Sequence, residues 1–156
     1  MRLNTYAVDP SGYKRLIAWN QHLADGPLSA SLRALVETRV SQINGCAFCL
    51  AMHTDEGRQA GLPQAKLDTV AAWRDDTSFT EAERAALGLA EAMTRLADGG
   101  GVPAEVWERA AGCFDEAELA ALVQVVAIIN TFNRLNVATE RTAQDYAAYA
   151  ARASTA

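Results

Sequence analysis

Clustered basic residues are missing from this chain. Its 156 residues include 14 Lys and Arg against 19 Asp and Glu, which gives a formal net charge of −5 at pH 7. The arginines are scattered at helical spacings and form no patch. Because proteins that bind phosphate backbones need grouped Lys and Arg, we expect no nucleic-acid partner.

Long apolar runs are missing as well. We find no uninterrupted run of about 18 apolar residues, the length that spans a bilayer, and therefore expect no membrane partner. The segment from Met1 to Pro10 has no apolar stretch of the kind that a secretion signal needs. Cytoplasmic location is the expectation that follows.

Cysteine is scarce, with three in the chain, and histidine is scarcer, with two. Small proteins held together by a disulfide framework carry more cysteines, usually in even number. In a reducing compartment, a Cys-x-x-Cys pair indicates redox chemistry or metal binding rather than a structural bridge.

Strand-like alternation of Val, Ile and Thr is nearly absent, whereas alanine is abundant, so the sequence predicts helices throughout. We predict an all-α fold of about seven to eight helices that forms one domain over residues 1–156. The expected helices are Gly12 to Ala24, Ser29 or Ser31 to Ile43, Cys46 to Gly61, a helix opened by Pro63, and helices that start after Thr80 and after Asp115.

Two of these helix starts carry a reciprocal cap. Thr80 and Asp115 each stand three residues before a glutamate, Glu83 and Glu118, which is the capping-box pattern. The segment from Leu119 to Leu135 is apolar around most of its circumference. Such a helix is either central in the fold or covered on one side by another subunit, which motivates our expectation of a homo-oligomer.

Three chemically active side chains share one helical face. Because a turn holds about 3.6 residues, Cys46, Cys49 and His53 align along a helix. Cys46 stands at the predicted N-terminus, where the helix dipole favours a thiolate, and His53 can take the thiol proton of Cys49. A Cys49 thiolate that attacks a peroxide becomes a sulfenic acid, with which Cys46 can form a disulfide for a separate reductant to open.

Two other interpretations of this face stay open. The cysteines can be buried as small hydrophobic residues, as free cysteines often are, although a pair with a histidine in register favours redox use. Alternatively Cys46, Cys49 and His53 supply three zinc ligands, with His22 or Cys113 as a fourth. A second Cys-x-x-Cys is absent, which disfavours zinc, and we expect Cys113 to lie in the core.

The run from Ser41 to Cys49 (SQINGCAFC), followed by Met52 and His53, resembles the alkylhydroperoxidase D-like core of the carboxymuconolactone decarboxylase superfamily. Less specific sequence similarities extend the resemblance to this family over about residues 28–135. They lie at Phe79–Leu87 (FTEAERAAL) and Ile129–Leu135 (INTFNRL).

The resemblance implies an all-helical fold that assembles into homo-oligomers, trimers or hexamers, and peroxidase activity without a further cofactor or metal. It implies that Cys49 attacks a hydroperoxide substrate, that Cys46 resolves the product, and that His53 belongs to a proton relay. The remaining partner is a dithiol or protein reductant.

One position departs from the family pattern. Members often carry a glutamate twelve residues before the first cysteine, where this chain has Ala34. Glu37, one turn later, and Glu56, three residues after His53, are the candidates to replace it, and we include Glu37 among the catalytic residues. The alternatives to a peroxidase are a lyase like the decarboxylase branch, which generally lacks the cysteine pair, and a non-enzymatic redox or zinc-binding module.

Overall fold

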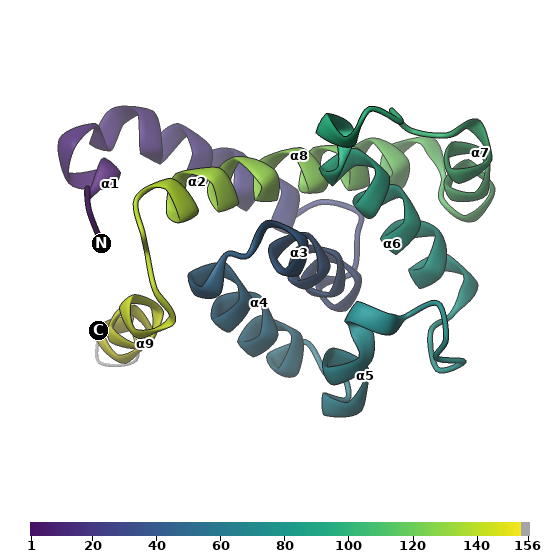
Figure 1. Ribbon diagram of the computed structural model, residues 1–156, viewed down its shortest axis with the longest axis horizontal. Helices are drawn as coiled ribbons and strands as arrows, with labels where there is room; N and C mark the ends of the chain where they lie inside the picture. The colour runs from purple at the N-terminus through teal and green to yellow at the C-terminus, as the bar shows by residue number, and fades with distance from the viewer. Residues whose placement is uncertain (154–156) are drawn as a thin grey trace.

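The computed structural model describes residues 1–153, and every regular element among them is a helix (Figure 1). The elements are α1 Thr5–Val8, α2 Pro10–Ala24, α3 Ala30–Asn44, α4 Ala47–Gln59, α5 Gln64–Thr69, η1 Val70–Ala72, α6 Glu81–Thr94, η2 Leu96–Asp98, α7 Ala104–Cys113, α8 Glu116–Ala138 and α9 Ala143–Ala153. The all-α prediction is confirmed. The described residues hold nine α-helices, close to the seven to eight expected, and two of them, α1 and α5, of 4 and 6 residues, are shorter than two turns.

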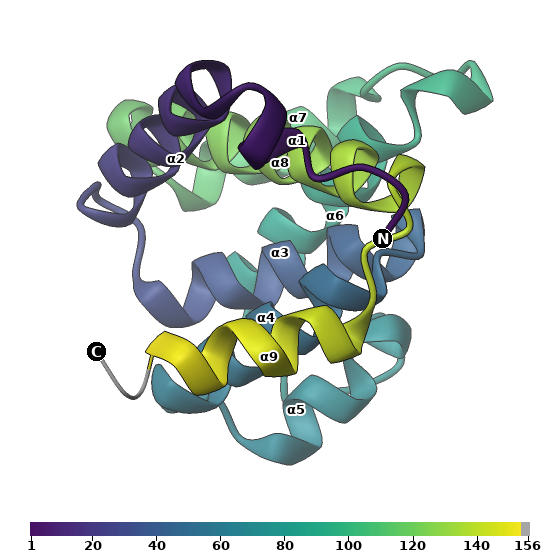
Figure 2. The same cartoon turned by 90° about the vertical axis from the view of Figure 1, so that its left-hand side faces the viewer.

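Helix α3 is the centre of the arrangement. It packs against α4, α6 and α8, while α2 lies along α8 and α9 covers the outer side of α4 (Figures 1 and 2). The turn between α3 and α4 lies next to α8, to which Asn44 at the end of α3 donates hydrogen bonds. Cys46 lies in this turn, and Cys49 lies in the first turn of α4.

The most apolar helix, α8, is a core element, as one of the two alternatives for it predicted. Val125, Val126 and Ile128 are fully buried there, and they pack with Val36 and Val40 of α3. Each buried aliphatic side chain contributes roughly 1.5–3 kcal/mol. Helix α8 is also long and apolar enough to cross a bilayer, but 44% of its most apolar window is buried, and core helices of soluble proteins pass the same test.

Both predicted capping boxes are present. Glu83 N–H donates to Thr80 Oγ1 and Thr80 N–H donates to Glu83 Oε2, and Asp115 and Glu118 exchange the same pair of bonds. A cap of this kind stabilises a helix by about 1 kcal/mol. The caps therefore fix where α6 and α8 begin.

The expectation that Cys113 lies in the core is wrong, because its side chain is exposed. Helix α7 buries Ala110 and ends at Cys113, and the half-buried Phe114 that follows packs against the core in its place. The last residue of a helix is free to face solvent when the next residue supplies the apolar contact.

Candidate redox site

The backbone of the α3–α4 turn positions the cysteine pair. Gly45 ends α3 in the left-handed conformation, with φ 67° and ψ 30°, which glycine adopts without a steric penalty. Cys46 is then the N-cap of α4, and its Sγ accepts a hydrogen bond from the backbone N–H of Cys49 at 3.3 Å. The sequence placed the helix start one residue early, but it identified Cys46 as the residue at that end.

Cys46 and Cys49 are joined by a disulfide bond. Their Cα atoms lie 5.3 Å apart, within the usual range for a disulfide, and the two residues are three positions apart in the chain. Both side chains are buried, with exposures of 1% and 0%. The two sulfurs are therefore bonded to each other inside the protein.

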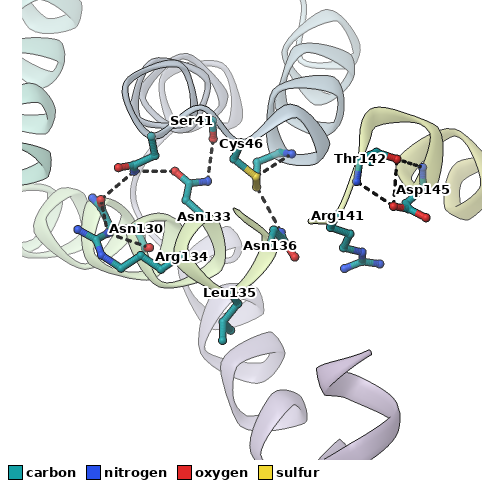
Figure 3. The surroundings of a disulfide bond; sticks show 12 residues. Ser41, Cys46, Asn130, Asn133, Arg134, Leu135, Asn136, Arg141, Thr142 and Asp145 are labelled. Carbon is teal, nitrogen blue, oxygen red and sulfur yellow. Dashed lines mark hydrogen bonds between the residues drawn. A yellow bond between two sulfur atoms is a disulfide. The ribbon is translucent and has the colours of Figure 1, made fainter. Parts of the chain in front are cut away.

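Asparagines of α8 hold this turn from the other side (Figure 3). Asn136 Nδ2 donates to Cys49 Sγ at 3.3 Å, and Asn133 Nδ2 donates to Ser41 Oγ at 3.1 Å. Asn44 Nδ2, at the end of α3, donates to Asn133 Oδ1 at 2.8 Å and to Asn130 Oδ1 at 3.0 Å. Hydrogen-bonded polar groups thus tie the turn to an otherwise apolar helix.

His53 faces two carboxylates. Its Nδ1 lies 2.7 Å from Oε2 of Glu56, on the same helix, and 3.3 Å from Oε2 of Glu37, on α3. His53 and Glu37 are buried, whereas the Glu56 side chain is 42% exposed. Arg33 Nε lies 3.6 Å from the same oxygen of Glu37. Both glutamates that the sequence left as alternatives therefore meet at one ring.

Comparison with known proteins identifies the relatives of this site. The sequence profile of the Carboxymuconolactone decarboxylase family matches residues 10–92, more than half of the chain and the whole of the α3–α4 unit. The chain belongs to the carboxymuconolactone decarboxylase family.

Individual members support this assignment. The uncharacterized protein YdfG of Bacillus subtilis (strain 168) is 33% identical over 137 residues, which are 88% of this chain and 92% of YdfG. ATU0492 from Agrobacterium tumefaciens is a protein of unknown function described as a candidate antioxidant defence protein AhpD. Its crystal structure superposes with a TM-score of 0.86 at 32% identity, covering 90% of this chain and 96% of that one.

The fold also supports enzymes of other kinds. The debrominase Bmp8 superposes with a TM-score of 0.78 at 20% identity, covering 87% of this chain and 73% of its own. At that identity the likeness shows the shared fold alone. What a carboxymuconolactone decarboxylase family member does is therefore decided by its site.

The charge states of Glu37 and His53 follow from burial and from neighbouring charges. Burial raises the pKa of Glu37 above its ordinary value, and the nearby His53 and Arg33 only partly oppose this. Burial by itself would lower the pKa of His53. The charge of Glu37 and the hydrogen bond to Glu56 outweigh burial, so the pKa of His53 is raised. Glu37 and His53 therefore keep their protons to a higher pH than isolated Glu and His side chains do.

The contacts of the ring select its tautomer. Because Nδ1 faces carboxylates, which only accept, Nδ1 carries the N–H, and in the neutral ring Nε2 holds the lone pair. Nε2 is buried and has no hydrogen-bond partner among the described residues. Cys49 precedes His53 by one helical turn on α4, so the two residues lie on one face of that helix.

A metal ion is the other use of such a cluster. Among residues 1–153, Glu37, His53 and Glu56 are the group whose ligand atoms lie within 4.8 Å of one another. Ligands of a tetrahedral zinc ion at 2.0–2.1 Å are separated by roughly 3.3 Å, whereas Nδ1 of His53 and Oε2 of Glu56 are at the direct hydrogen-bond distance of 2.7 Å. Arg33 adds a positive charge next to Glu37. Glu56 is thus hydrogen-bonded to the ring while Glu37 and Arg33 are in charge contact beside it, an arrangement that differs from a tetrahedral zinc site.

A small cavity lies beside the carboxylates. It measures about 180 Å³ and is lined by Ala30, Arg33, Ala34, Glu37 and Glu56. Ala34, at the position where family members often carry a glutamate, therefore lines the same cavity as Glu37. A larger groove of about 600 Å³ runs between α4 and α9, along residues that include Leu50, Thr54 and Tyr146, and it does not include the relay.

Sequence reasoning missed the contributions of Asn136 and Arg33. A signal for the first was present: Asn130, Asn133 and Asn136 recur every three residues on an apolar helix, a polar stripe that must meet polar partners. Arg33 stands four residues before Glu37, the spacing of a helical ion pair.

Proposed function

We propose that this chain is a thiol peroxidase that reduces a hydroperoxide through Cys49 and Cys46. The observation that carries the proposal is the buried Cys46–Cys49 bond, one turn from a histidine whose free nitrogen is oriented by two carboxylates. A lyase has no need of this bond. The similarity to ATU0492, described as a candidate antioxidant defence protein, supports the same chemistry.

The first half-reaction oxidises Cys49. Nε2 of His53 accepts the thiol proton, and the Cys49 thiolate attacks the terminal oxygen of the hydroperoxide. The O–O bond breaks, the terminal oxygen stays on sulfur as a sulfenic acid, and the alkoxide takes the proton from His53 and leaves as an alcohol. Sulfur loses two electrons and the peroxide gains them.

The second half-reaction forms the observed bond. Cys46 attacks the sulfur of the Cys49 sulfenic acid, the S–S bond forms, the S–O bond breaks, and the hydroxide leaves as water with the proton of Cys46. One hydroperoxide and two thiols thus give one alcohol, one water and one disulfide. A dithiol, free or on a partner protein, supplies the two electrons that reopen the disulfide.

Cysteine variants test the proposal. Reduced protein treated with one equivalent of an alkyl hydroperoxide should lose two hydrogens between Cys46 and Cys49, as measured by mass spectrometry. Cys49→Ser should abolish peroxide consumption, and Cys46→Ser should accumulate a sulfenic acid that a dione reagent traps. Cys113→Ser, at the exposed end of α7, is the matched control and should keep the wild-type rate. Intact thiols after peroxide treatment would exclude the peroxidase.

We also propose that the working form is a homo-oligomer. Large apolar side chains are exposed on several helices, among them Val8 on α1, Trp107 on α7 and Tyr149 on α9. Sedimentation velocity tests this proposal, since a single monomeric species at micromolar concentration would contradict it.

A further inference from the structure

The side chain of Asn136, on α8, contacts a sulfur of the disulfide. Its side chain is 5% exposed, and its Nδ2 lies 3.3 Å from Sγ of Cys49, which is itself fully buried. The neighbouring asparagines of α8 bond to other polar side chains, Asn133 to Ser41 and Asn130 to Thr94. Asn136 directs its amide to sulfur instead (Figure 3).

The direction of this hydrogen bond is fixed by chemistry. A disulfide sulfur carries no proton and can only accept, so the NH₂ group of the amide faces it. The two sulfurs therefore have separate donors: Cys46 accepts the backbone N–H of Cys49, and Cys49 accepts the side chain of Asn136. The donor for Cys49 comes from a helix 87 residues away in sequence.

We infer that Asn136 is a catalytic residue that stabilises the Cys49 thiolate, an inference that rests on the peroxidase function proposed above. A neutral sulfur is a weak acceptor, whereas hydrogen bonds to an anion are roughly twice as strong as neutral ones. The same N–H therefore binds the thiolate more tightly than it binds the thiol or the disulfide. In a buried site, this donor replaces part of the hydration that a thiolate loses.

The contact also bears on the reopening of the disulfide. When a dithiol thiolate attacks Sγ of Cys46, the S–S bond breaks and its electron pair stays on Cys49. Cys49 is then the leaving thiolate, and Asn136 already faces the atom that receives the charge. A reduced state stabilised in this way makes the disulfide a stronger oxidant.

Other groups around Cys49 have to be held constant in a test. On α4 these are Cys46 and His53, with Glu37 of α3 behind the ring. Beyond α8, the Arg141 guanidinium lies 3.9 Å above the ring of Phe48. None of them is altered by a substitution at Asn136.

The experiment titrates Cys49 without peroxide. In a Cys46→Ser, Cys113→Ser background, the alkylation rate of Cys49 by iodoacetamide and the ultraviolet absorbance of its thiolate are followed against pH. Asn136→Leu, which keeps the volume and removes the donor, should leave about tenfold to a hundredfold less thiolate at a fixed pH below the midpoint. Asn136→Asp, which puts a negative charge near the sulfur, should reduce the thiolate at least as much.

The outcomes separate this inference from the function itself. Thr131→Ala, on the same helix, removes a hydroxyl that bonds to Ala127 O and should titrate as the background does. Circular dichroism checks that each variant folds, and Asn136→Ala, which removes the donor without adding a charge, decides the question if Asn136→Leu does not fold. Thiolate fractions within twofold of the background in a folded variant would overturn the role of Asn136. Because no peroxide is present, that result would leave the peroxidase proposal intact. Conversely, if the protein reduced no peroxide, the titration would still report whether Asn136 stabilises the Cys49 thiolate.

Discussion

Oε2 of Glu37 lies 3.3 Å from Nδ1 of His53, and both side chains are buried although they come from different helices. No hydrogen bond among the described residues reaches this oxygen, so its contacts with the ring and with Arg33 are contacts between charges. A buried carboxylate in this position stabilises the imidazolium that forms when His53 accepts a proton. Four predictions follow from this site and from the helices that hold it.

Removing the carboxylate of Glu37 should slow peroxide reduction by about 10- to 100-fold, because the protonated ring loses its buried counter-charge. The matching rescue is Ala34→Glu in the Glu37→Ala protein. Ala34 and Glu37 border the same cavity of about 180 Å³, so the new carboxylate has room on the same helical face. Initial rates of hydroperoxide consumption measure both effects. Equal rates for Glu37→Ala and wild type would remove Glu37 from the relay.

Glu56→Gln should lower the pH at which His53 loses its proton. The hydrogen bond and the charge of Glu56 both raise the pKa of His53, although burial opposes them, so removing the carboxylate takes away a raising cause. The imidazole signals of His53 in an NMR titration give the midpoint directly. A midpoint that moves up or stays unchanged would contradict the assigned hydrogen bond.

Gly45→Ala should lower the free energy of unfolding by about 1–2 kcal/mol, since a Cβ disfavours the left-handed conformation that this residue adopts. No atom lies within 4 Å of the added Cβ, so the cost is that of the backbone alone. Gly112→Ala is the control, because this glycine lies inside α7 with equally open space and alanine is the better helix former. Urea denaturation of both proteins should therefore give shifts of opposite sign.

Asp55→Asn should lower the pH at which Tyr146 ionises. Burial and the hydrogen bond to Asp55, whose Oδ2 accepts from the phenol at 2.9 Å, together raise the pKa of Tyr146 to about 12. Without the carboxylate the midpoint should fall toward the ordinary value of about 10. Phenolate absorbance against pH reports the change. Asp68→Asn, on α5, is a control that keeps the Tyr146 contact, and a drop of equal size there would exclude Asp55 as the cause.

Local features of the sequence predicted the helical framework of the site. The capping pairs at Thr80 and Asp115 and the break at Gly45 mark helix ends through interactions within a few residues. In the same way, the spacing of the three residues Cys46, Cys49 and His53 predicted that they share one helical face. The side chain of Cys113 was misjudged because burial at a helix end depends on what packs nearby, and here Phe114 takes that position.

By itself the sequence determined that the chain is helical and that two thiols and an imidazole lie on one helical face, because helix geometry relates residues three and four apart. Only the tertiary structure decided which groups from other helices meet them. Glu37 of α3 reaches His53, and Asn136 of α8 reaches Cys49. These contacts depend on how α3, α4 and α8 pack against one another, and that packing is set by the whole buried core rather than by any short stretch of residues.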